Sequence, residues 1–194
     1  MNNSFKAIAL ALSVASAPLV FAGENTQIFE QELGSKFNED LMFQDLSKSF
    51  PSPDGTLTYA YLPKGDFGIP FKSHSAYLTP TSKVVAIIEA TKIEDNDAAC
   101  NSTLRYFADE IADKQFGNFK TLDTLKKMGY SMDGSDGVSP IQVRYDPVKN
   151  YSLQYGCVPS SSEAGKFAFI VSFSANELKE VAKKEYDQLV ATKG

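Results

Sequence analysis

Two cysteines constrain the fold of this 194-residue chain more than any other feature. Cys100 lies in a run whose apolar residues recur at helical spacing, whereas Cys157 lies in a run whose apolar residues alternate as in a strand. Both side chains therefore point toward a common core. The even count, without a Cys-x-x-Cys motif, favours one structural disulfide, Cys100–Cys157, over a redox-active pair. We expect this bridge to fix a helix to a strand.

The first 22 residues have the pattern of a cleavable secretory signal. Lys6 precedes an apolar run over 7–17, and the small residue Ala22 suits cleavage at Ala22–Gly23. The run is too short to cross a bilayer as a helix. We therefore predict a signal peptide over 1–22 and a periplasmic or extracellular protein. The short, alanine-rich leader favours bacterial export.

Residues 23–194 have the length of one domain with its own core. The formal net charge is −5 and becomes −6 when the segment that contains Lys6 is removed. Phosphate contacts need clustered lysine and arginine, so this acidic chain is a poor binder of nucleic acid. Anionic membrane surfaces are disfavoured for the same reason, and no membrane span is expected.

Alternating or continuous apolar runs predict a series of strands. Val84–Ala90 is nearly all apolar apart from Glu89, which is typical of a strand in the middle of a sheet. Other strands are expected at 56–62, 76–79, 141–145, 151–157 and 167–173. Short reversals between successive strands require antiparallel pairing.

Helices are expected before, between and after these groups of strands in the sequence. Phe29, Leu33, Phe37 and Leu41 recur every four positions and predict an amphipathic helix within 25–49. Further helices are expected from Asn96 or Asp97 to Gly117, over 122–128, and after a capping box formed by Ser174 and Glu177. The pattern predicts a single α+β domain: a mainly antiparallel sheet of five to six strands, helices packed on one face, and one disulfide.

His74, the only histidine, is flanked by Ser73 and Ser75, and a serine hydrolase would need such a base. Neighbours in sequence are weak support for a triad, and the Gly-x-Ser-x-Gly motif is absent, so we expect a surface histidine. With one histidine and both cysteines in a disulfide, the ligands that zinc prefers are missing. No motif for a cofactor is present.

Two acidic features have ordinary structural explanations. The turn Asp133–Gly137 offers carboxylates for calcium, but its spacing does not match an EF-hand loop. Glu89 lies in an apolar strand, where burial could raise its pKa as a general acid requires. An exported hydrolase would need a second carboxylate near Glu89, and Asp66 and Asp133 are the candidates.

The loop over 63–71 combines two glycines and two prolines with Phe67, Ile69 and Phe71. Exported domains often present apolar residues on such a scaffold, so these three side chains are the candidate partner-binding residues. The alternative is that they turn back under the loop and extend the core.

Together these features favour an exported non-enzymatic binding protein, such as an inhibitor, adaptor or envelope accessory. Its partner would be another protein or an envelope ligand. A carboxylate-dependent hydrolase and a carrier of a small apolar ligand remain alternatives. A carrier would have an unfilled, aromatic-lined cavity beneath its helices.

Overall fold

A computed structural model describes residues 27–46, 55–121, 123–124 and 141–192. The predicted signal peptide over 1–22 and the predicted cleavage position lie outside the described residues. The predicted helix over 122–128 lies almost wholly outside them, and so does the Asp133–Gly137 turn.

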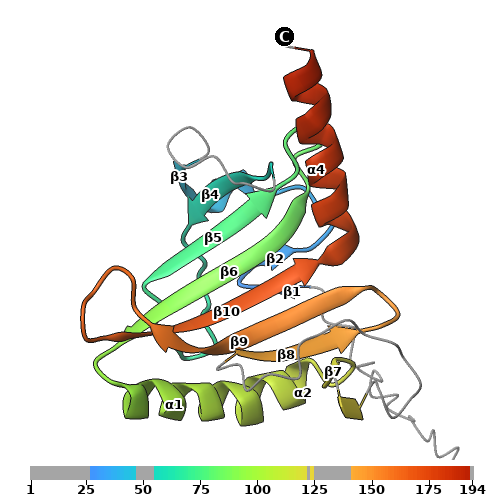
Figure 1. Cartoon of the computed structure of the whole chain (residues 1–194). Coiled ribbons are helices and arrows are strands. Elements are labelled where there is room, and N and C mark those ends of the chain that lie inside the picture. The colour runs from blue at the N-terminus through green and yellow to red at the C-terminus, as the bar shows by residue number, and fades with distance from the viewer. Residues whose placement is uncertain (1–26, 47–54, 122, 125–140, 193–194) are drawn as a thin grey trace, which may run out of the picture.

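An eight-stranded antiparallel sheet forms the centre of the fold (Figure 1). Its spatial order is β3-β4-β5-β6-β10-β9-β8-β7. The strands are β3 (Met42–Asp45), β4 (Leu57–Tyr61), β5 (Ser73–Leu78), β6 (Val85–Glu94), β7 (Lys120–Thr121), β8 (Ile141–Asp146), β9 (Tyr151–Pro159) and β10 (Phe167–Ala175).

The prediction of an α+β fold with a mainly antiparallel sheet is confirmed, but the count of five to six strands is wrong. The two extra strands, β3 and β7, lie at the edges of the sheet, where short strands leave little periodicity in the sequence. The prediction of a central strand is confirmed, because β6 pairs with β5 on one side and with β10 on the other.

The predicted helix within 25–49 is wrong. This segment forms the two-stranded hairpin β1 (Gln27–Ile28) and β2 (Gln31–Glu32), a single 3-10 turn η1 (Glu39–Leu41), and strand β3. Phe29 and Glu30 join β1 to β2 with φ of 49° and 61°. Positive φ at both central residues is the requirement of a tight hairpin turn whose twist matches its strands.

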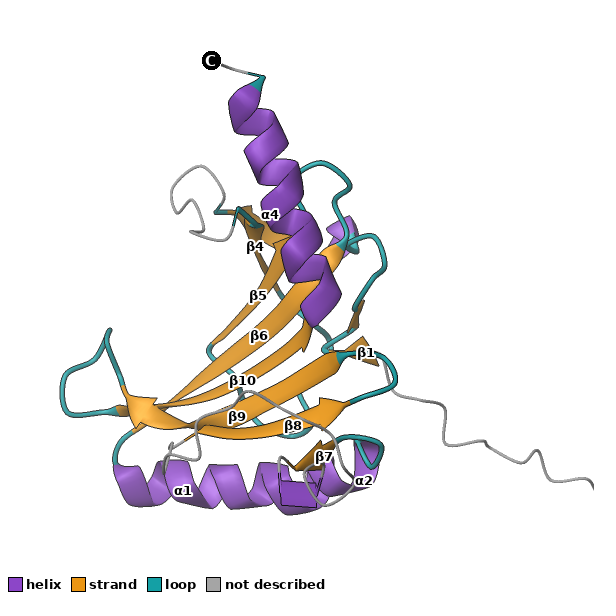
Figure 2. Ribbon diagram, turned by 45° about the vertical axis from the view of Figure 1, so that its right-hand side comes forward, coloured by secondary structure: helices purple, strands orange, loops and turns teal. Residues whose placement is uncertain are grey.

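The helices follow two of the long strands. After β6 the chain forms α1 (Asp97–Tyr106), which continues through a π-helical segment η2 (Phe107–Ala112) into α2 (Asp113–Gln115). After β10 it forms α4 (Asn176–Ala191), whose second half extends past the sheet (Figure 2). No helix within the described ranges has the length and apolar character needed to cross a membrane.

The capping predictions have different outcomes. Asn96 is the N-cap of α1, and its side-chain oxygen accepts a hydrogen bond from the Ala99 N–H at 2.9 Å. The capping box predicted for the last helix is wrong, because Ser174 lies inside β10. There its Oγ is 2.7 Å from Ser152 Oγ, a buried contact that links β10 to β9.

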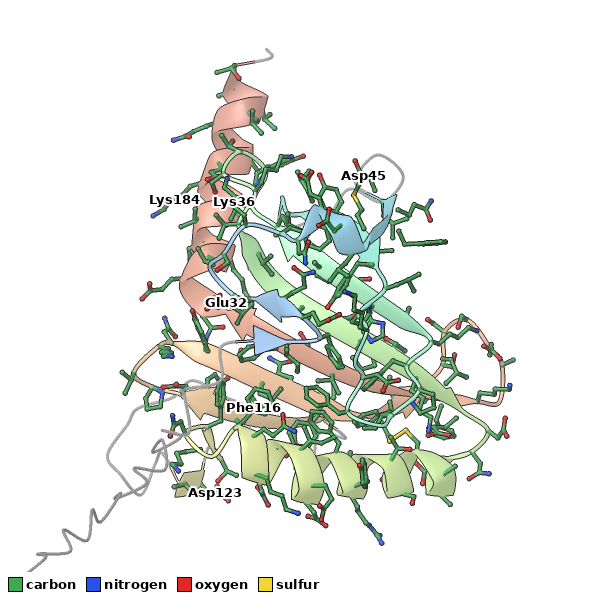
Figure 3. The ribbon with its side chains drawn as sticks, turned by 180° about the vertical axis from the view of Figure 1, so that it is seen from behind. Glu32, Lys36, Asp45, Phe116, Asp123 and Lys184 are labelled. Atoms are coloured by element: carbon green, nitrogen blue, oxygen red, sulfur yellow. A yellow bond between two sulfur atoms is a disulfide. The ribbon has the colours of Figure 1, made fainter. Side chains whose placement is uncertain are left out.

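One face of the sheet holds the core. Strand alternation places Ile88, Ala90, Phe169, Val171 and Phe173 on this face, and all are buried. The α1–α2 segment and the β1–β2 hairpin pack against it; seen from behind, the hairpin lies in front of the sheet and α1 runs along its lower edge (Figure 3). Aromatic rings fill much of this layer: Phe107, for example, lies 5.0 Å from Tyr155 and 5.6 Å from Phe169 between ring centroids.

Candidate functional site

The disulfide joins α1 to β9, as predicted. Cys100 and Cys157 are bonded at an S–S distance of 2.10 Å, with their Cα atoms 6.0 Å apart. Both residues are buried in the layer between helix and sheet. The bridge therefore fixes the start of α1 against the sheet.

The loop over 62–72 crosses the same face of the sheet beside α1. Phe67 and Gly68 both adopt positive φ, and the Asp66 carboxylate accepts a hydrogen bond from the Gly68 N–H at 3.1 Å. The Ile69 N–H donates to the Asp66 carbonyl at 3.0 Å. This local bonding gives the loop a defined shape.

The three candidate partner-binding side chains of this loop lie against the core. Ile69 is 3% exposed, and Phe67 and Phe71 are half-buried. Both rings contact Phe29 of the β1–β2 turn, at centroid distances of 5.2 and 5.1 Å. Their direct role in binding a partner stays a prediction, and in this conformation they offer it little surface.

A surface pocket of about 320 Å³ opens between this loop and α1. It is lined by Gly68, Ile69, Pro70, Lys92, Ser102, Thr103 and Tyr106. The residues come from the loop, from the end of β6 and from one side of α1. The loop singled out by the sequence thus forms one wall of the pocket, mainly through its backbone and proline.

Lys92 brings a positive charge to the pocket and is held in place by two neighbours. Its Nζ is 2.6 Å from the Glu94 carboxylate and 3.4 Å from Thr103 Oγ1. Thr103 also donates a hydrogen bond to Glu94. Burial alone would raise the pKa of Glu94, but the hydrogen bonds from Lys92 and Thr103 lower it below its usual value. The ion pair therefore persists in mildly acidic solution.

The hydroxyl groups of the pocket come from α1. Ser102 is exposed, and the Tyr106 hydroxyl lies 3.5 Å from the Phe67 carbonyl, at the limit of a hydrogen bond. Sequence reasoning missed Lys92, Thr103 and Tyr106. Strand spacing could have placed Lys92 and Glu94 on one face of β6, but nothing in the sequence indicated that α1 would lie beside the loop.

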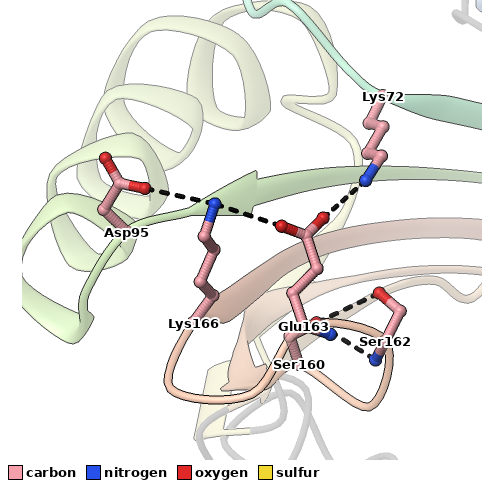
Figure 4. Close-up of polar contacts among 6 residues, drawn as sticks. All are labelled: Lys72, Asp95, Ser160, Ser162, Glu163 and Lys166. Atoms are coloured by element: carbon pink, nitrogen blue, oxygen red, sulfur yellow. Dashed lines mark hydrogen bonds and ion pairs between the residues drawn. The ribbon is translucent and has the colours of Figure 1, made fainter.

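An ion-pair network joins three connecting segments near this end of the sheet (Figure 4). Glu163, in the β9–β10 connection, lies 2.5 Å from Lys72 and 3.1 Å from Lys166. Lys166 also lies 3.5 Å from Asp95, just before α1. Hydrogen bonds from Lys72 and Lys166 lower the pKa of Glu163. The network ties the end of the loop and the start of α1 to one shared segment.

His74 is not on the surface, contrary to expectation. It is 7% exposed and faces the rings of Phe29 and Tyr61 at 5.0 and 5.7 Å. Its neighbours Ser73 and Ser75 lie on the opposite face of β5 by strand alternation. The sheet therefore separates the imidazole from both serines.

Glu89 is half-buried on the face of the sheet opposite the core, where its cross-strand neighbours are Ser75 and Ser172. Burial raises its pKa, as predicted for an acid in this strand. Asp66 belongs to the loop on the other face, and its charge acts on His74. The fold thus keeps Glu89 and Asp66 apart, and Asp133 lies outside the described residues.

Within the described parts of the chain, no three His, Cys, Asp or Glu side chains gather in a way that could hold a metal ion. Comparison with protein-family models, with curated proteins and with solved structures finds no match to this chain.

Proposed function

We propose that this chain is an exported, non-enzymatic binding protein of the periplasm or extracellular space, and that it binds its partner through the pocket between the 62–72 loop and α1. One observation carries the proposal: the loop that the sequence indicates as a contact surface forms a pocket with a disulfide-fixed helix. A site on rigid elements loses little conformational entropy on binding.

The lining determines what the pocket can bind. Ser102, Tyr106 and Lys92 supply hydrogen-bond donors, while Pro70 supplies apolar contact. Glu94 compensates the charge of Lys92, so the pocket is suited to a carbonyl or carboxylate oxygen on a small apolar group rather than to a multiply charged ion. A peptide side chain or the polar end of an envelope ligand has this chemistry.

The positions of the titratable groups support binding over hydrolysis. His74 faces aromatic rings rather than a serine, and Glu89 and Asp66 lie on opposite faces of the sheet. A general base has to lie within hydrogen-bond reach of its nucleophile, directly or through one water.

Native mass spectrometry of the protein recovered from its own compartment tests the proposal. We expect the wild type to retain an added mass that is lost on denaturation. Ser102→Trp fills the pocket and removes the added mass. Asp109→Trp, at an exposed position further along the same helical segment and outside the pocket, retains it.

Two results would contradict the proposal. An added mass that survives in Ser102→Trp would place the ligand elsewhere. A bare chain that turns over a substrate in a hydrolase screen would favour the carboxylate-dependent hydrolase.

A further inference from the structure

Two segments that pack on the sheet, the β1–β2 hairpin and the 62–72 loop, enclose the imidazole of His74. Phe29 of the hairpin turn and Phe71 of the loop lie 5.0 and 5.6 Å from it between ring centroids. Tyr61 of β4 lies at 5.7 Å. His74 Nε2 is buried and has no hydrogen-bond partner within the described ranges. An imidazolium N–H at Nε2 would therefore have no acceptor in this conformation.

The hairpin and the loop hold each other in place and together form a cover over His74 (residues 27–32 and 62–72). Phe29 contacts Phe67 at a centroid distance of 5.2 Å, and the Lys64 N–H donates to the Glu30 carboxylate. The hairpin has two residue pairs, and a hairpin of this size is not stable by itself. Its position depends on these contacts, so we expect the two segments to leave the sheet together.

The ionisable groups around His74 do not compensate a charge on its ring. Asp66 of the loop favours the charged form, but burial has the larger effect and lowers the pKa of His74. The carboxylates of Asp66 and Glu30 accept hydrogen bonds from backbone N–H groups of the loop. On β6, the residue opposite His74 is Ala90. Two lysines of the adjoining segments have carboxylate partners: Lys72 with Glu163, and Lys92 with Glu94.

We propose that His74 is a pH sensor for the pocket beside α1. Its protonation releases the cover from the sheet, and the pocket loses the wall formed by Gly68, Ile69 and Pro70. The closed cover excludes the proton, whereas an open cover lets the imidazolium contact water. The closed state is therefore favoured above the ordinary pKa of histidine near 6.5, and this preference is lost as the pH falls toward 4. The inference rests on the proposed function and adds that the pocket releases its ligand in acid.

Hydrogen–deuterium exchange of the full disulfide-bonded chain at pH 7 and pH 5, corrected for the intrinsic effect of pH on exchange, tests the proposal. In the wild type we expect the protection factors over 27–32 and 62–72 to fall by at least about tenfold between the two pH values. At both pH values these amides should be less protected than those of β9, because the cover opens without unfolding the sheet.

Three variants serve as controls. His74→Phe keeps an aromatic ring among its aromatic neighbours but takes up no proton, so protection of the cover should change by less than about twofold between the two pH values. His74→Gln is a second neutral variant and should behave in the same way if the phenylalanine does not fit. Ser73→His, added to His74→Phe, places a histidine at the exposed neighbouring position and should not restore the pH dependence.

The proposal is overturned if the wild type and the neutral variants respond equally to acid, or if Ser73→His restores the response. It is also overturned if the cover and β9 are equally protected, since His74 would then contact water only on global unfolding. The measurement needs no ligand, so a bare chain in native mass spectrometry would contradict the proposed function without deciding this test.

Discussion

His74 lies in an environment that disfavours its charged form. Its ring contacts three aromatic rings, and its Nε2 has no hydrogen-bond partner among the described residues. Burial lowers its pKa to about 4, although the carboxylate of Asp66 acts in the opposite direction. The neighbouring Tyr61 hydroxyl is also buried and has no hydrogen-bond partner in the described part of the chain, and burial followed by the charge of Glu30 raises its pKa. Both groups are therefore neutral at pH 7.

Acid should weaken the fold through His74. In the unfolded chain the histidine has an ordinary pKa near 6.5, so below that pH the unfolded state binds a proton that the folded state excludes. The contribution of neutral His74 to the unfolding free energy is complete above pH 6.5 and is lost as the pH falls toward 4. Between pH 7 and pH 4.5 we expect the wild type to lose about 2 kcal/mol more unfolding free energy than His74→Phe.

Urea denaturation of both proteins at the two pH values measures this difference. The variant keeps every carboxyl group, so acid effects on those groups cancel in the comparison. Equal losses in the two proteins would show that His74 is accessible to protons in the folded state.

At the scale of single elements, α1 depends on the residue that caps its N-terminus. Asn96 has extended backbone angles and satisfies the Ala99 N–H, which no residue within the helix can reach. Asn96→Ala should lower the unfolding free energy by about 1 kcal/mol, whereas Asn96→Asp keeps an accepting oxygen and should change it little. Urea denaturation with the disulfide intact measures both. Equal losses in the two variants would mean that the cap does not stabilise α1.

Strands with strong periodicity could be predicted from the sequence, and the N-terminal segment could not. Phe29, Leu33 and Phe37 are buried, as their spacing suggested, but an extended chain that winds over the sheet buries them. A spacing of four shows that side chains share a buried side; it does not show how the backbone joins them. The turn at Phe29 and Glu30 is held by contacts with the 62–72 loop, including the hydrogen bond from the Lys64 N–H to Glu30.

The candidate site was predictable only in part. The glycines and prolines of the 63–71 loop indicated its position, but the burial of Ile69 depends on the hairpin and sheet beneath it. Lys92 and Tyr106 are 14 positions apart and reach the same pocket because the chain reverses between β6 and α1. Local sequence patterns do not encode such a tertiary contact.

In the whole molecule, Gly55 determines how closely α4 approaches the sheet. Its φ is +80°, and an added Cβ would lie 2.4 Å from Tyr186 Cβ. Gly55→Ala should destabilise the protein by about 2 kcal/mol or more, since it combines backbone strain with a clash that α4 has to relieve. Gly65→Ala, with nothing within 4 Å, should stay within about 0.5 kcal/mol of the wild type.

Thermal unfolding followed by circular dichroism measures both glycine variants. Similar stabilities for the two would mean that α4 does not depend on close contact with residue 55.

The disulfide has a further consequence for the way the chain reaches this structure. Among the described strands, β3–β6 and β7–β10 form the two halves of the sheet, and the pairing of β6 with β10 joins them. Glu94 and Phe167 in that pair are 73 positions apart. Cys100 follows Glu94 by six positions, and Cys157 precedes Phe167 by ten. Oxidation therefore shortens the loop that this pairing has to close and lowers its entropic cost by about 1 kcal/mol. An oxidised chain joins its two halves by a nearly local event, whereas a reduced chain has to find the same pairing through a long-range search.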